Sequence, residues 1–124
     1  MLSTAVIGQI ALPVRDLRRA IEFYRDTLGL LLLFEHSNAA FFDCAGIRLM
    51  LAESDRAERE PARCLVYFTV PDIQAAAREL ERRGVALERQ PHIVNRLPSY
   101  DLWLAFFRDS EGNPLALISE RPRA

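Results

Sequence analysis

The side chains best suited to proton transfer in this sequence are His92 and Tyr67. The sequence contains two histidines, and an imidazole works as a general acid or base near neutral pH. His92 follows Pro91 in a segment that leads to Trp103, while Tyr67 lies in an apolar run. Neither residue stands in a recognisable catalytic motif. The sequence therefore nominates His92 and Tyr67 as candidates and leaves open whether any reaction is catalysed.

Residues able to bind a metal are sparse. One conceivable metal site, here called the non-standard site because it follows no known ligand motif, would combine Gln9, His36 and His92 with a carboxylate such as Glu35 or Glu53. The spacing of these residues matches no ligand motif. The residue types and their spacing therefore do not by themselves indicate a metal site.

The two cysteines lie in apolar, strand-like runs. Cys44 and Cys64 are followed or preceded by hydrophobic residues, which is typical of free thiols that pack as small apolar side chains. We expect no disulfide between them.

Length and composition predict one globular domain. The chain has 124 residues, of which 50% are hydrophobic and 27% charged, enough to bury a core without a disulfide or structural metal. The formal net charge of −1 is spread along the chain, unlike the basic patch of a nucleic-acid-binding protein. The longest uncharged run, residues 1–14, is too short for a membrane span and lacks signal-peptide features. We therefore predict a cytoplasmic protein that contacts neither nucleic acid nor membrane.

The chain repeats itself. The run from Gln9 to Leu17 matches the run from Leu65 to Ile73, because in both an apolar strand ends at an aspartate and a helical pattern follows. This self-similarity predicts a single domain, 1–124, built from module one at about 4–53, a polar connector at 54–62, and module two at about 63–120.

Hydrophobic periodicity predicts the same elements in each module. In module one, Asp16 and Gly29 bound a helix, and in module two Asp72 and Gly84 do so. Alternating residues predict the strands: Val6–Val14, Leu30–His36, Ala39–Cys44, Ile47–Ala52, Cys64–Val70, Val85–Glu88, Leu102–Arg108 and Leu115–Ser119. The predicted fold class is α+β, with two tandem βαβββ modules forming a curved mixed sheet around a cup.

Strand parity separates a helix-facing set from a cup-facing set. The strongly apolar positions are assigned to the helix side, among them Val6, Leu49, Leu51, Leu115 and Leu117. The residues predicted to line the cup are Gln9, Arg48, Met50, Leu65, Tyr67, His92, Trp103, Ala116 and Ile118. Such a lining is mainly apolar with a few polar groups, as in small-molecule pockets. The loops at 53–63 and 90–100 would set its size.

Two motifs and the tandem repeat carry a family resemblance. They are the run from Gln9 to Leu17 with Ala20, Phe23, Tyr24 and Leu28-Gly-Leu30, and the run from Phe106 to Asn113. Over essentially the whole chain they resemble the vicinal oxygen chelate superfamily of glyoxalases, bleomycin resistance proteins and extradiol dioxygenases. In that family the stretch Asp109-Ser-Glu-Gly112 is a turn before the last strand, so a structural role is implied for it.

The resemblance implies a homodimer and gives four positions for a divalent metal. Those positions fall on Gln9, Met50, Leu65 and Ala116. Gln9 offers an oxygen, the thioether of Met50 suits copper(I), and Leu65 and Ala116 offer no lone pair. Three of the four usual ligands are therefore missing, and from this we predict no cofactor, with a divalent metal kept as the alternative. The sequence does not decide whether the modules pair within one chain or across two.

These observations favour a metal-independent binder of a small apolar or aromatic molecule. The alternative is a glyoxalase-, dioxygenase- or epimerase-like enzyme with a non-standard or absent metal site, using His92 or Tyr67 as acid or base. An accessory module whose cup binds an effector is a third reading. The identity of the ligand does not follow from the sequence.

Overall fold

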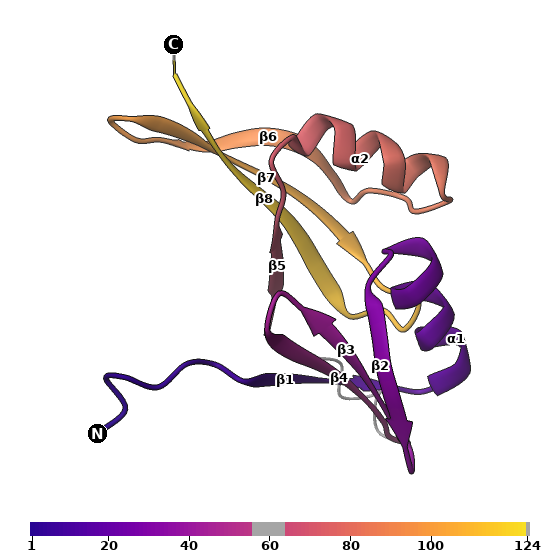
Figure 1. Cartoon of the computed structure of the whole chain (residues 1–124). Coiled ribbons are helices and arrows are strands. Elements are labelled where there is room, and N and C mark those ends of the chain that lie inside the picture. The colour runs from indigo at the N-terminus through magenta and orange to yellow at the C-terminus, as the bar shows by residue number, and fades with distance from the viewer. Residues whose placement is uncertain (56–63, 124) are drawn as a thin grey trace. The chain divides into compact units, whose positions relative to one another are not determined.

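The computed structural model describes residues 1–55 and 64–123. Most of the connector predicted at 54–62 lies outside these described residues. Contacts divide the chain into two compact units, Met1–Ala62 and Arg63–Ala124, each of which is described by itself. Each unit contains one βαβββ series, which confirms the predicted tandem fold (Figure 1).

Unit 1 is a four-stranded mixed sheet with one helix. Its elements are β1 (Gln9–Val14), α1 (Leu17–Glu22), a π-helical turn (Phe23–Thr27), β2 (Leu31–His36), β3 (Ala39–Cys44) and β4 (Ile47–Glu53). The strand order is β1-β4-β3-β2, and β1 runs parallel to β4. A parallel pair needs a crossover connection, and the segment from α1 through β3 supplies it.

Two carboxylates hold the start of α1. Asp16 accepts a hydrogen bond from the amide of Arg19 at 3.1 Å, and Glu53, at the end of β4, accepts one from the amide of Leu17 at 3.0 Å. Both satisfy amides that a helix leaves unpaired at its first turn. The helical segment ends before Gly29, whose φ of 77° is readily adopted by glycine.

Helix α1 packs against β3 and β4. Ala20 and Ile21 of the helix are buried, and so is Tyr24 of the π-helical turn, whose ring lies 6.0 Å from that of Phe42. On β4, Leu49 and Leu51 are also buried. The prediction that these two leucines face the helix is confirmed.

Unit 2 repeats the arrangement. Its elements are β5 (Val66–Thr69), α2 (Ile73–Arg82), β6 (Arg89–Arg96), β7 (Tyr100–Arg108) and β8 (Pro114–Pro122). The strand order is β5-β8-β7-β6, with β5 parallel to β8. Asp72 caps α2 by accepting from the amide of Ala75 at 3.1 Å. Helix α2 lies along β6, β7 and β8 (Figure 1), and Leu115 and Leu117 are buried as predicted.

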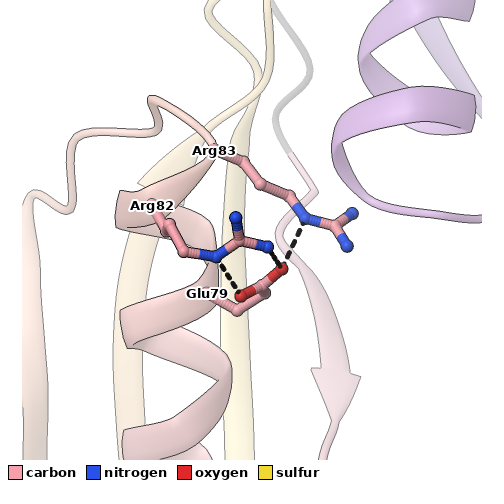
Figure 2. Close-up of polar contacts among 3 residues, drawn as sticks. All are labelled: Glu79, Arg82 and Arg83. Carbon is pink, nitrogen blue, oxygen red and sulfur yellow. Dashed lines mark hydrogen bonds and ion pairs between the residues drawn. The ribbon is translucent and has the colours of Figure 1, made fainter.

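The last turn of α2 carries a three-residue ion cluster, drawn in Figure 2. Arg82 Nε donates to Glu79 at 2.8 Å, and Arg83 Nε donates to the same carboxylate at 2.8 Å. Hydrogen bonding from Arg82, and then from Arg83, lowers the pKa of Glu79 from 4.5 to about 2. Because the cluster is solvent-accessible, it contributes little to stability.

Several predicted strand limits are wrong. Strand β7 begins at Tyr100 rather than Leu102, and β8 runs over Pro114–Pro122 rather than Leu115–Ser119. Val85–Glu88 is not a strand: Val85 donates to Leu80 O and is buried where the chain leaves α2. The strand is instead β6, a mostly polar edge strand whose sequence lacks clear alternation. At the N-terminus, Val6 precedes β1 and is 88% exposed, and β5 begins at Val66 rather than Cys64.

No helix within the described part of the chain is long and apolar enough to cross a membrane.

The turn before β8 is built around Asp109. Its Oδ1 accepts from the amides of Glu111 and Asn113, both at 2.8 Å, and its Oδ2 accepts from Asn113 Nδ2 at 2.9 Å. Asp109 and Asn113 are 6% and 1% exposed, and Gly112 has a φ of 85°. These bonds give Asp109 the structural role implied by the resemblance.

Replacing Asp109 by alanine should destabilise the protein by about 1–3 kcal/mol, because two turn amides lose their acceptor. Asp109→Asn keeps one side-chain acceptor oxygen and should cost less. Urea unfolding followed by circular dichroism measures both. Glu120→Ala, at an exposed site on β8, is the control and should stay within about 0.5 kcal/mol of the wild type. An Asp109→Ala protein as stable as this control would contradict the role.

Candidate functional site

Each sheet has one face covered by its helix and one open face. The register of unit 1 aligns Gln9 with Arg48 and Ala11 with Met50, and residues aligned on neighbouring strands point to the same side of a sheet. Their chain neighbours Leu12, Leu49 and Leu51 are buried on the α1 side. Gln9, Ala11, Arg48 and Met50 therefore belong to the open face.

An apolar row crosses this open face. Ala11 on β1 aligns with Met50 on β4, Met50 with Phe41 on β3, and Phe41 with Phe34 on β2. The rings of Phe34 and Phe41 stack with centroids 4.6 Å apart and planes 21° apart. Phe34 is 47% exposed, so the row ends in an aromatic surface accessible to a ligand.

A series of polar side-chain contacts borders the apolar row. Arg48 Nε donates to Gln9 Oε1 at 3.1 Å, and Gln9 Nε2 lies 3.6 Å from Met50 Sδ in hydrogen-bonding geometry. Gln9 thus links a guanidinium to the thioether of the apolar row. The predicted grouping of Gln9, Arg48 and Met50 is present within unit 1.

The open face of unit 2 is also largely apolar. Tyr67 aligns with Ala116 and Ala116 with Phe106, and in the next row Ile118 aligns with Leu104 and Leu104 with His92. The His92 and Phe106 rings lie 6.3 Å apart. Tyr67 is 47% exposed, whereas Ala116 is fully buried.

The two candidate proton carriers occupy opposite edges of this sheet. Tyr67 is on β5 and His92 is on β6, so two strands separate them in the order β5-β8-β7-β6. Three interstrand spacings amount to about 14 Å between backbones. A proton donor and a proton acceptor must each approach the reacting atoms to about 3 Å. This separation disfavours Tyr67 and His92 as a working pair on one small substrate.

The ring of His92 has a fixed hydrogen-bond partner. Its Nδ1 lies 2.8 Å from the carbonyl oxygen of Gln90. Because a carbonyl oxygen only accepts, Nδ1 carries the proton in this contact, which leaves the neutral ring with its lone pair on Nε2.

Trp103 does not belong to the open face, so its predicted place in the cup is wrong. It aligns with Ser119 and shares strand parity with the buried Ala105 and Phe107. The guanidinium carbon of Arg121 lies 6.0 Å from the Trp103 ring centroid, and Arg121 also bonds Gln74 on α2. Trp103 is therefore on the helix side of unit 2. Leu65 lies just before β5.

Sequence parity alone missed the aromatic pair of unit 1. Strand β2 shifts register between Leu32 and Phe34, and this bulge turns Phe34 to the side of Phe41. The adjacent Phe42 is fully buried, as expected if neighbouring phenylalanines point to opposite faces. Alternation on β3 was the available signal for Phe41, but the bulge that brings Phe34 beside it has no clear sequence mark.

The residues at the four expected metal positions do not fit a divalent metal. Gln9 Oε1 is the one oxygen among their side chains, and it accepts from the positively charged Arg48. Met50, Leu65 and Ala116 supply a thioether and two hydrocarbon side chains, which are poor partners for hard divalent cations. The described residues contain no cluster of three His, Cys, Asp or Glu side chains arranged for a metal.

The carboxylates of the alternative metal site have other partners. Glu35 forms an ion pair with Arg18 of α1 at 3.0 Å, and Glu53 caps the same helix. His36 belongs to β2 and His92 to β6. The non-standard set is therefore not brought together within unit 1.

Both cysteines are free thiols. Burial, and then the nearby carboxylate of Asp43, raises the pKa of Cys44, as suits an unreactive packing thiol. Cys64 is exposed, so the expectation that it packs in a strand is wrong.

Comparison with known proteins identifies relatives of the chain. Residues 6–117 match the family model described as "Glyoxalase/Bleomycin resistance protein/Dioxygenase superfamily". The uncharacterized protein YraH of Bacillus subtilis is 29% identical over 119 residues, covering 85% of this chain and 91% of YraH. The metallothiol transferase FosB of Staphylococcus haemolyticus is 36% identical over 69 residues, covering 53% of this chain and 50% of FosB.

A solved structure shares the fold over nearly the full chain. TnmS3, an antibiotic binding protein from Streptomyces sp. CB03234, superposes with a TM-score of 0.77 at 23% identity, covering 97% of this chain and 99% of TnmS3. Identity at this level supports similarity of fold.

The hydrogen bond to Gln90 predicts the tautomer of His92. In its neutral form His92 should carry its proton on Nδ1, and long-range proton–nitrogen correlation spectra distinguish this tautomer from the Nε2–H form. The exposed His36 serves as the internal reference, and His92→Gln assigns the signals. A neutral His92 protonated on Nε2 would contradict the geometry described for β6.

Proposed function

The chain belongs to the glyoxalase/bleomycin resistance protein/dioxygenase superfamily, and from this premise we propose that it binds a small apolar or aromatic molecule without a divalent metal. The ligand would lie on an open sheet face. The observation that carries this proposal is the apolar row of unit 1, which ends in the stacked and accessible ring of Phe34.

The physical chemistry of the row supports an apolar ligand. A planar ligand that covers the Phe34 ring would remove water from both surfaces, at about 25 cal/mol for each Å² of apolar area. Aromatic partners also gain from offset stacking. Met50, beside Phe41, has a flexible thioether side chain that adapts to irregular ligand shapes.

The donor set supports independence from metal. In metal-dependent catalysis a Lewis acid polarises the substrate oxygens, and Gln9 with Met50 gives little affinity for such an ion. The contact of Gln9 with Arg48 places a positive charge beside the glutamine oxygen, and that charge would repel a divalent cation. Binding without metal is therefore favoured over chemistry assisted by metal.

Relatives support binding and enzymatic functions to different extents. The antibiotic binding protein TnmS3 has the same fold, which is compatible with sequestration of a small organic molecule. FosB is a metallothiol transferase, but this chain spans about half the length of that relative, and the metal positions of the chain lack a suitable donor set. We therefore rank binding first.

The second candidate function is metal-independent proton transfer by His92. It is favoured by the oriented imidazole, whose Nε2 is left as a base by the hydrogen bond from Nδ1 to Gln90. Tyr67 lies across the sheet from His92, so the two side chains would not act together. A substrate found by screening would decide: undiminished turnover by His92→Ala would exclude His92 as the acid or base.

We further propose a cytoplasmic homodimer that contacts neither nucleic acid nor membrane. The balanced charge of the chain and its family membership support this assignment. Sedimentation equilibrium gives the oligomeric state, and dilution below the dimer dissociation constant would abolish ligand binding if the site depends on both subunits.

The neutral fluorescent probe N-phenylnaphthylamine should bind the wild-type protein with increased emission. Phe34→Ala should weaken this binding by roughly tenfold to a hundredfold, because the more exposed ring of the stacked Phe34–Phe41 pair is lost. Leu33→Ala is the matched control. Leu33 is adjacent to Phe34 and similarly exposed at 44%, but it lies at the bulge and aligns with no residue of β3. Equal loss in both variants would contradict a ligand surface at Phe34.

Divalent nickel, zinc, iron and manganese should leave the melting temperature unchanged. Scanning calorimetry of tag-free protein tests this, together with the metal content of the protein as purified. Gln9→Ala is the matched variant, because it removes the remaining oxygen donor of the four positions. Stoichiometric metal, or a stabilisation by metal that Gln9→Ala abolishes, would overturn metal independence.

A further inference from the structure

Arg48 is a cation placed beside the apolar row of unit 1. Many arginines of the chain have carboxylate partners, including Arg18, Arg25, Arg82, Arg83, Arg96, Arg108 and Arg123. Arg48 instead donates to the neutral amide of Gln9, and among the described residues it has no ion pair. Its charge is therefore not neutralised by direct contact with the described part of the chain.

Gln9 fixes which edge of the guanidinium is engaged. The hydrogen bond uses Nε of Arg48, while the amide nitrogen of Gln9 is held by Met50 Sδ. The two Nη groups form the remaining edge, which donates two parallel hydrogen bonds to a planar or tetrahedral anion. A guanidinium held in this way loses less conformational freedom on binding than a mobile one.

The nearest carboxylate by register does not cancel this charge. Asp43 on β3 aligns with Arg48 on β4, but its Oδ1 accepts from the amide of Gly46 at 3.1 Å. That bond holds the carboxylate at the turn between β3 and β4. Asp43 therefore reduces the local positive potential without occupying the Nη edge of Arg48.

The spacing between charge and apolar row suits one small molecule. Arg48 and Met50 are two residues apart on β4, which corresponds to about 6.7 Å along a strand. Phe41 lies beside Met50 on the next strand. A ligand whose aromatic ring lies over Met50 and Phe41 would thus reach Arg48 with an acidic group that is attached to the ring directly or through a short linker.

We propose that the ligand of unit 1 is a planar aromatic anion, with a carboxylate or sulfonate on the Nη edge of Arg48 and its ring on the row of Met50, Phe41 and Phe34. This inference rests on the proposed binding function and adds the charge of the ligand. A neutral analogue keeps the apolar contact and loses the charge-assisted hydrogen bonds. A cationic ligand would in addition be repelled by Arg48.

Two matched fluorescent probes test the charge. Anilinonaphthalene sulfonate is the anionic counterpart of neutral N-phenylnaphthylamine, and both report an apolar environment by increased emission. The wild-type protein should bind the anionic probe roughly tenfold to a hundredfold more tightly, the range expected for hydrogen bonds to a charged group. Arg48→Met should remove this preference, measured within each protein as the ratio of the two probe affinities, and Arg48→Lys should keep part of it.

Arg89 provides the matched control. It aligns with Phe106 on the open face of unit 2, so it is a second arginine beside an aromatic ring. Arg89→Met should leave the preference for the anionic probe intact. If Arg89→Met removes the preference and Arg48→Met does not, the assignment to Arg48 is overturned.

The remaining outcomes distinguish failure of the anionic-ligand proposal from failure of the proposed binding function. Equal binding of both probes by the wild type would overturn the anionic ligand and leave the apolar binding function standing, whereas no binding of either probe would overturn both. Circular dichroism verifies that each variant is folded. Should Arg48→Met not fold, Arg48→Gln gives the same comparison with a polar side chain, and a retained preference in that variant would overturn the proposal.

Discussion

The parallel register between β1 and β4 determines which residues form the open face of unit 1. It aligns Gln9 with Arg48 and Ala11 with Met50. A slip of one residue would exchange the two faces of a strand, exposing Leu49 and Leu51 and burying an arginine. The cost of burying that charge and exposing two leucines makes the observed register the stable one.

The same register couples the helix to the sheet. Glu53 ends β4, opposite Val14, and its carboxylate caps the first turn of α1. Asp16, the residue that directly precedes α1, caps the same turn. The last strand of the unit therefore helps to fix where the helix begins. The closed core and the open face thus arise from one set of pairings.

Central strands and helices were predictable from the sequence because their residues alternate or recur regularly. The buried leucines of β4 and β8 and the aspartate caps of both helices were identified in this way. Edge strands were harder: β6 is mostly polar, both β2 and β6 contain register shifts, and a bulge reverses the parity that assigns side chains to faces. Val85 resembled the start of a strand because it is apolar, but it packs where α2 ends.

The candidate site was predictable only in part for related reasons. Gln9, Arg48 and Met50 follow from parity on two regular strands, whereas Phe34 depends on the bulge in β2. The prediction for Trp103 is wrong because an indole suits a ligand pocket by residue type, whereas strand parity groups Trp103 with Ala105 and Phe107, which are buried on the α2 side. The contact between Gln9 and Arg48 depends on side-chain rotamers, which no sequence pattern specifies. That contact gives the one oxygen at the expected metal positions to a guanidinium, so the positive charge of this face is supplied by the chain itself, and the proposed ligand would be one that complements that charge and the apolar row beside it.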